Sequence, residues 1–112
     1  MIKTKFSYAP NFIEKTAKNI LIACGFSEIK SYSLISGKDL EESGVTARAL
    51  RVDNPVSRDY EYLRPSLKPG LINALSENKK ITDKINLFEL GKVYKKTKEK
   101  TAEEKYFLSG IS

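Results

Sequence analysis

The segment of residues 85–94 constrains the fold of this 112-residue chain more than any other part of the sequence. Side chains along a strand alternate between the two faces of a sheet. Apolar residues here fall on both faces, which is typical of a strand that is covered on both sides. One face carries Ile85, Leu87, Glu89, Gly91 and Val93, and the other carries Phe88 and Leu90. We therefore expect a central strand with protein packed against each face.

The first helix is predicted to begin at Pro10 and Asn11 and to end before Gly25, which suits a left-handed helix stop. Asn11 can cap this helix, and Glu14 stands where it can complete a capping box. The apolar residues of the helix recur at spacings of three and four, which predicts one buried stripe. This stripe contains Ile13, Ala17, Ile20, Leu21 and Cys24. Cys24 is the only cysteine, so it cannot form an internal disulfide, and the stripe places it in the core.

Two further helices follow residues that are typical of helix starts. Ser36 is expected to cap a short helix that ends near Gly44. Ser66 is expected to cap a longer helix that has Pro69 in its first turn. Asn78 lies near the end of that helix, where we expect it to cap the exposed carbonyl groups. Strands are predicted over residues 27–35, 50–53, 60–64 and 106–111.

The charged residues 95–105 are predicted to form the loop of a hairpin between the last two strands. Strands joined by a hairpin favour a mostly antiparallel sheet, and the predicted helices can flank it. The expected fold class is therefore α+β. We expect residues 1–112 to form a single domain, and a fragment of a longer chain, because the sequence stops just inside a predicted strand.

The composition excludes several classes of protein and site. The net charge of +6 favours polyanionic partners, but the basic residues are spread out and interleaved with glutamate, which is typical of a solvated surface. The absence of histidine removes the commonest general base and the commonest metal ligand. No apolar run approaches the ~20 residues of a membrane helix, and the N-terminus lacks the apolar core of a secretory signal. We therefore expect a cytoplasmic protein with no membrane partner.

Three motifs occur in a characteristic order in the second half of the chain. The first is Asn54-Pro55, the second is residues 63–71 (Leu-Arg-Pro-Ser-Leu-Lys-Pro-Gly-Leu), and the third is residues 87–91 (Leu-Phe-Glu-Leu-Gly). Together with Asn78 between the last two, they resemble the synthetase-like core module of the β subunit of bacterial phenylalanyl-tRNA synthetase. Residues 25–29 (Gly-Phe-Ser-Glu-Ile) resemble the entry to the same module, so the resemblance covers about residues 11–94.

The resemblance implies a class II aminoacyl-tRNA synthetase-like core, with a mostly antiparallel sheet flanked by helices. The family's enzyme is an α2β2 assembly that joins phenylalanine to its tRNA using ATP and Mg²⁺. Its α subunit carries the active site. The resemblance therefore implies that this chain is a non-catalytic part of the enzyme, with no cofactor of its own, which packs against the α subunit.

The motifs contain three polar residues that could form a structural or degenerate site: Asn54, Arg64 and Glu89. The resemblance implies that Arg64 corresponds to an arginine that contacts the α-phosphate of ATP in catalytic class II cores. In those cores an acidic residue follows two positions later. Here that later position is Ser66. Glu89 lies on a strand face that is otherwise apolar, where an unpaired charge would be costly. We therefore expect Glu89 to form an ion pair with an arginine or lysine as an internal tie, with Arg64 as the leading candidate. We expect no catalytic, cofactor-binding or metal-binding residue.

Two other functions remain open at this point. The chain could be a catalytic class II core that has lost part of its pattern. It could instead be an RNA-binding module, because Tyr60 and Tyr62 lie near Arg58 and Arg64, and bases stack on aromatic rings.

Overall fold

The computed structural model describes residues 10–46, 49–99 and 101–112, and the side chains from residue 12 onward within these ranges. It has the predicted α+β fold. The helices are α1 (Pro10–Ala23), α2 (Gly37–Glu42) and α3 (Lys68–Lys79), with a 3-10 turn η1 (Arg58–Tyr60). The strands are β1 (Ser27–Glu28), β2 (Leu34–Ile35), β3 (Leu50–Arg51), β4 (Tyr62–Leu63), β5 (Leu87–Lys96) and β6 (Ala102–Ile111).

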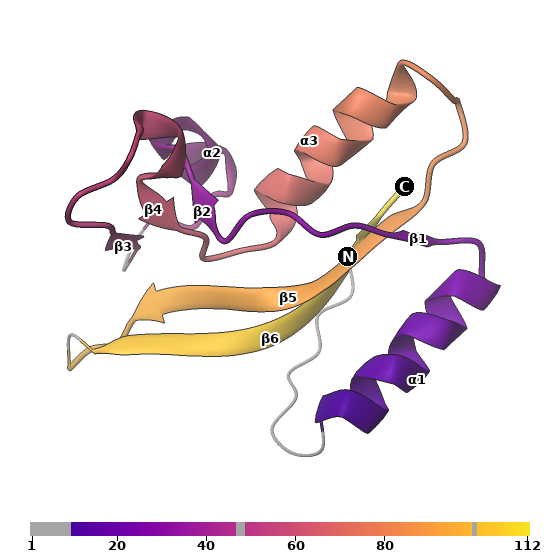
Figure 1. The fold of residues 1–112 in the computed structure, drawn as a ribbon, viewed down its shortest axis with the longest axis horizontal. Coiled ribbons are helices and arrows are strands. Elements are labelled where there is room, and N and C mark those ends of the chain that lie inside the picture. The colour runs from indigo at the N-terminus through magenta and orange to yellow at the C-terminus, as the bar shows by residue number, and fades with distance from the viewer. Residues whose placement is uncertain (1–9, 47–48, 100) are drawn as a thin grey trace.

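The hairpin of β5 and β6 forms the centre of the molecule (Figure 1). β5 is the middle strand of a sheet with the order β1-β5-β6, which confirms the prediction of a central strand. β6 pairs with β5 in antiparallel orientation, whereas the short strand β1 pairs with it in parallel orientation. The two faces of β5 pack against different helices, so the hairpin lies between α1 and α3 (Figure 1).

Each face of the hairpin has its own apolar cluster, as the alternation in β5 predicts. On the α3 side, Leu87 and Val93 of β5 pack with Leu67 and Leu71. On the α1 side the buried residues are Phe88, Leu90 and Leu108, and three partly buried residues pack against them. Those three are Ala17, Leu21 and Phe26.

The hairpin is longer than the sequence pattern predicts, because β6 begins at Ala102 and not at residue 106. The charged residues pair across the two strands. Lys95 of β5 lies opposite Glu103 of β6 in the register, and Nζ of Lys92 in β5 lies 3.6 Å from a carboxylate oxygen of Glu104 in β6. Opposite charges on neighbouring strands favour pairing, so a segment that resembles a solvated loop extends the sheet. The chain reverses between Thr97 and Thr101, whose hydroxyl oxygens are 2.7 Å apart.

A second, smaller sheet has the order β2-β4-β3, and β4 is antiparallel to both neighbours. The single strand predicted over residues 27–35 is therefore wrong: it is two short strands, β1 and β2, that belong to different sheets. The reason lies between them. The N–H group of Ser31 donates to the carboxylate of Glu89 at 3.0 Å, so the backbone leaves the first sheet at this point.

The end of α1 follows the prediction. Gly25 has φ of +92°, and the N–H group of Phe26 donates to the carbonyl oxygen of Leu21 at 2.9 Å, which closes the last turn. The predicted cap residue Asn11 has its side chain outside the described residues. Glu14, the other residue of the predicted capping box, forms an ion pair with Lys18, whose Nζ lies 3.1 Å from a carboxylate oxygen of Glu14.

Lys18 also connects α1 to the sheet. Its Nζ lies 2.8 Å from a carboxylate oxygen of Glu28 in β1. The hydrogen bond to Glu28, with a smaller contribution from Glu14, raises the pKa of Lys18 above its usual value. The ion pair therefore fixes the orientation of α1 on the hairpin at the edge of the apolar contact.

Only two of the five residues in the predicted stripe on α1 pack against the hairpin. Ala17 and Leu21 pack against the hairpin, but Ile13 and Ile20 are 41% and 59% exposed. Cys24 is exposed, so its predicted place in the core is wrong. The apolar surface of α1 is wider than the strip of the helix that contacts β5 and β6.

The helix starts of α2 and α3 differ in how well they match the pattern. Ser36 caps α2 as predicted, since its Oγ accepts from the N–H group of Asp39 at 3.1 Å. α3 begins one residue later than predicted, with Leu67 at the N-cap, and Ser66 Oγ accepts from the N–H group of Lys68 at 3.1 Å. Asn78 is exposed at the end of α3, and its amide donates to the carbonyl oxygen of Ala74 at 2.7 Å.

No helix in the described ranges is long and apolar enough to cross a membrane.

Candidate functional site

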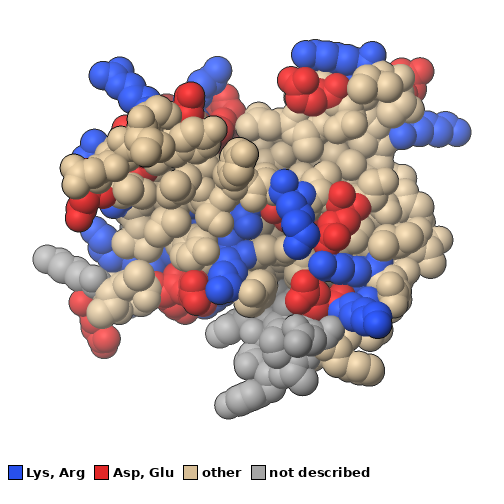
Figure 2. All heavy atoms as spheres, viewed as in Figure 1, with Lys and Arg blue, Asp and Glu red and all other residues tan. Residues whose placement is uncertain are grey.

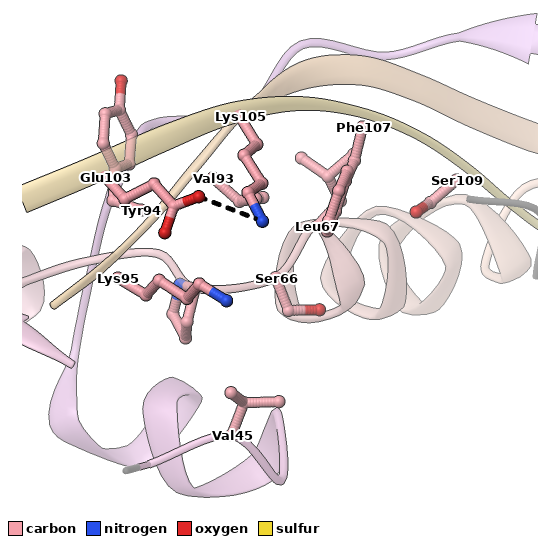
Figure 3. A pocket seen from close by; sticks show the side chains of 11 residues that line it. Val45, Ser66, Leu67, Val93, Tyr94, Lys95, Glu103, Lys105, Phe107 and Ser109 are labelled. Atoms are coloured by element: carbon pink, nitrogen blue, oxygen red, sulfur yellow. Dashed lines mark ion pairs between the residues drawn. The ribbon is translucent and has the colours of Figure 1, made fainter. Parts of the chain in front are cut away.

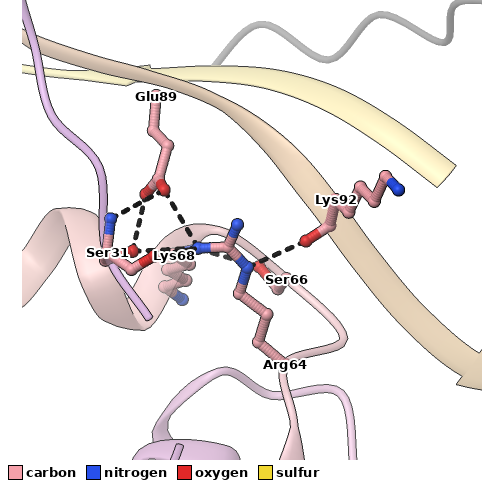
Figure 4. Close-up of polar contacts among 6 residues, drawn as sticks. All are labelled: Ser31, Arg64, Ser66, Lys68, Glu89 and Lys92. Carbon is pink, nitrogen blue, oxygen red and sulfur yellow. Dashed lines mark hydrogen bonds and ion pairs between the residues drawn. The ribbon is translucent and has the colours of Figure 1, made fainter. Parts of the chain in front are cut away.

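Glu89 is the most deeply buried charged residue among those described, with 2% of its surface exposed. It projects from the α3 face of β5 (Figure 4). One carboxylate oxygen accepts from Ser31 Oγ at 2.8 Å, and the other accepts from the N–H group of Ser31 at 3.0 Å and from Arg64 Nη1 at 3.0 Å. Both oxygens are therefore bonded, as a buried carboxylate requires.

Arg64 is the residue that directly follows β4, and its side chain extends to Glu89 (Figure 4). Its side chain is 6% exposed, so the predicted ion pair forms in the interior. Nε donates to the carbonyl oxygen of Lys92 at 2.8 Å, and Nη1 also donates to Ser31 Oγ at 2.9 Å. The network of Ser31, Arg64 and Glu89 thus joins the segment after β1, the end of β4 and the middle of β5.

The network has a clear electrostatic consequence. The charge of the guanidinium is balanced by Glu89, and its Nε and Nη1 atoms donate to the carbonyl oxygen of Lys92, to Ser31 Oγ and to Glu89. A phosphate that took Nη1 of Arg64 would leave the carboxylate of Glu89 buried and unpaired, which is strongly unfavourable. The geometry is that of an internal tie between the two sheets.

Two glycines, which have no side chain, make room for the side chains of this network. A Cβ atom added at Gly91 would collide with Nη2 of Arg64, and one added at Gly70 would collide with the side chain of Ser31. Both glycines belong to the sequence motifs, and close approach of a neighbouring side chain explains why a larger residue does not fit. Ser31 carries no distinguishing pattern in the sequence, because its role depends on contacts with residues 33 and 58 positions away.

We expect the substitution Gly91→Ala to lower the free energy of unfolding by about 1–3 kcal/mol, because the buried guanidinium must shift away from Glu89. Chemical denaturation followed by circular dichroism measures this change. Gly37→Ala is a suitable control, because a Cβ atom there would meet Tyr62 at an ordinary contact distance of 3.6 Å. Equal stability of the two variants would contradict the tight packing of Arg64 against Gly91.

The comparisons with known proteins agree with this architecture. A family model described as the phenylalanyl tRNA synthetase beta chain CLM domain matches residues 5–112. The chain belongs to this family. Among curated relatives, the phenylalanine–tRNA ligase beta subunits of Dehalococcoides mccartyi and Leptospira biflexa are 34% and 35% identical over 102 and 104 residues. These alignments cover 88% and 89% of this chain but only 13% of each relative, so the CLM domain spans a small part of their length.

Solved structures confirm the class II aminoacyl-tRNA synthetase-like fold of the CLM domain. Two structures of pyrrolysyl-tRNA synthetase from Desulfitobacterium hafniense superpose with TM-scores of 0.69 and 0.74. They cover 80% and 89% of this chain, and 33% and 36% of their own chains. The sequence identity is 24% in both, so this likeness concerns the fold alone.

The CLM domain does not bring Asn54 into the network of Arg64 and Glu89. Asn54 is exposed in the bend between β3 and η1. The tyrosines that raised the possibility of RNA stacking also separate. Tyr62 is half-buried in β4, whereas the ring of Tyr60 packs edge-to-face against that of Tyr32 at 5.8 Å. Of the three candidate residues, only Arg64 and Glu89 meet.

Proposed function

We propose that this CLM domain is a non-catalytic platform within a phenylalanine–tRNA ligase and that it binds the α subunit through α1. The observation that carries the proposal is the exposed apolar surface of α1. Phe12, Ile13 and Ile20 are 75%, 41% and 59% exposed, although they are large apolar side chains on one side of a short helix. Clustered exposed apolar residues are typical of a protein contact surface.

The arrangement of this surface supports a helix-packing contact. Phe12, Ile13 and Ile20 are joined on their side of the helix by Thr16 and Ala23, at spacings of three and four residues. This second stripe lies beside the one that packs on the hairpin, so α1 can contact two bodies at once. The sheet then holds the helix rigidly while its outer surface meets the partner.

The Arg64 network supports the non-catalytic part of the proposal. The arginine that would contact a phosphate in a catalytic core is neutralised by Glu89 and held by the carbonyl oxygen of Lys92. A phosphate that displaced Glu89 from Nη1 would break this buried ion pair, which disfavours an ATP site at these residues. In the parent enzyme, which would act in the cytoplasm as an α2β2 assembly, ATP, Mg²⁺ and the reacting end of the tRNA would bind to the α subunit.

The distribution of charge favours the platform over an RNA-binding module. Figure 2 shows basic and acidic side chains interspersed on the face that it presents. Several basic residues also have acidic partners, as in the pairs Lys18–Glu28, Arg51–Glu61 and Lys92–Glu104. An RNA surface would instead gather unpaired basic residues, because phosphate contacts supply most of the affinity.

One binding experiment separates these functions. The chain is mixed in turn with the α subunit, with tRNA and with ATP plus Mg²⁺, and complexes are measured by analytical ultracentrifugation and calorimetry. We expect binding to the α subunit alone. Affinity for tRNA that falls steeply with salt would instead support an RNA-binding module, and binding of ATP would support a retained catalytic core.

A further inference from the structure

A cleft on the α3 side of the hairpin has no role in the platform function. It has a volume of about 190 Å³ and lies between the start of α3 and the strands β5 and β6 (Figure 3). Its floor is apolar and is formed by Leu67, Val93 and Phe107. An engineered apolar cavity of roughly 150 Å³ holds a benzene ring, so this cleft has room for one ring and a small polar group.

A buried hydroxyl group lies at the inner end of the cleft. Ser109 of β6 is only 1% exposed and lines the cleft, and Figure 3 shows its side chain directed toward the interior. Its hydroxyl has no hydrogen-bond partner among the described residues. Among the described residues, every fully buried side-chain oxygen has a hydrogen-bond partner. Because the Ser109 hydroxyl has none, it is not fully enclosed, and it reaches the space of the cleft. A ligand atom could accept the hydrogen bond that the protein leaves unused.

Positive charge gathers at the outer end of the cleft. Lys95 and Lys105 extend into it from β5 and β6, and their ammonium groups point toward its centre (Figure 3). Lys105 pairs with Glu103 at 3.1 Å. Lys95 forms no ion pair with a described residue, so the residues around the cleft carry a net charge of about +1. An apolar floor with one uncompensated ammonium group suits an amphipathic anion.

We propose that this cleft binds a small monocarboxylate that bears an apolar group of about the size of one ring. The apolar group would cover Leu67, Val93 and Phe107, and the carboxylate would accept from the ammonium group of Lys95. The single free charge favours a monocarboxylate over a phosphate, which carries more charge and no apolar part. The cleft lies away from the exposed surface of α1, so this site and the proposed platform function can be tested separately.

The first test is a titration of the chain with benzoate, followed by two-dimensional NMR. We expect saturable shifts of the amide signals of Leu67, Val93 and Ser109. Benzamide has the same shape without the charge and should bind at least about tenfold more weakly, as the loss of a charge-assisted hydrogen bond implies. Equal binding of benzamide, or stronger binding of inorganic phosphate or ATP at the same residues, would overturn the proposal.

The second test compares two lysines that are neighbours on β5. We expect Lys95→Met to weaken benzoate binding about tenfold. Lys96→Met removes the same charge from the next residue, which is also exposed but does not line the cleft, and should leave affinity unchanged. Both lysines are exposed, so both variants should fold. Equal effects of the two substitutions would assign the binding to general charge and contradict a defined site.

Discussion

Replacing Glu89 by alanine is expected to lower the free energy of unfolding by about 3–5 kcal/mol, since it leaves the guanidinium of Arg64 buried and unpaired. Ser31 would lose its acceptors at the same time, because its N–H group and its hydroxyl both donate to Glu89. A domain of this size has a total stability of about 5–15 kcal/mol, so the loss is a large fraction of it. We therefore expect the variant to be partly unfolded near physiological temperature.

Urea denaturation of matched variants measures this effect. Glu104→Ala is the control, because Glu104 also pairs with a basic residue, Lys92, but has a side chain that is 58% exposed. An exposed pair contributes about 0–1 kcal/mol. The double substitution Arg64→Met, Glu89→Leu should recover part of the loss, because it removes both buried charges together. If Glu89→Ala were no less stable than the control, the internal tie would not hold the two sheets together.

Replacing Ile20 by aspartate in the full β subunit is expected to prevent assembly with the α subunit. Ile20 is 59% exposed in this chain, so the substitution should not unfold the domain. In the assembly, however, a carboxylate would be placed within an apolar helix contact, where an unpaired charge costs several kcal/mol. We expect the affinity between the subunits to fall by at least about a hundredfold, which corresponds to 2.7 kcal/mol or more.

Co-purification of the two subunits and sedimentation of the complex measure this change. Lys15→Asp introduces the same side chain on α1, but outside the stripe of exposed apolar residues. It should leave assembly largely intact. Normal assembly of the Ile20→Asp variant would contradict the role of α1 as the contact surface.

The sequence predicts the centre of this fold well because strand periodicity reports burial directly. The alternation in β5 identifies both covered faces, and the position of Glu89 among apolar residues indicates a buried carboxylate in need of a partner. Arg64 could be assigned as that partner because the neighbouring motifs contain few other basic residues. Ser31 could not, since its part in the network arises from the folded path of the chain after β1.

Two predictions were wrong for the same physical reason: the burial of the α1 stripe and the loop before β6. A local sequence pattern does not show which surface or strand a residue will face in the fold. Ile20 and Cys24 fit the apolar periodicity of α1, but the sheet reaches only Ala17 and Leu21. The charged start of β6 likewise resembles a loop until Glu104 is placed beside Lys92 of β5, with which it forms an ion pair. In both cases the partner surface decides whether a residue is buried or paired, and a single sequence does not contain that information.

The proposal of a non-catalytic platform is tested most directly by counting active sites in the assembled enzyme. A non-hydrolysable analogue of phenylalanyl-adenylate is titrated by calorimetry into the purified complex of α and β subunits. With Arg64 held by Glu89, we predict that one analogue binds per pair of α and β subunits, and that every bound molecule lies on the α subunit. Binding of two analogues per pair, with one protecting the residues around Arg64, would contradict this account.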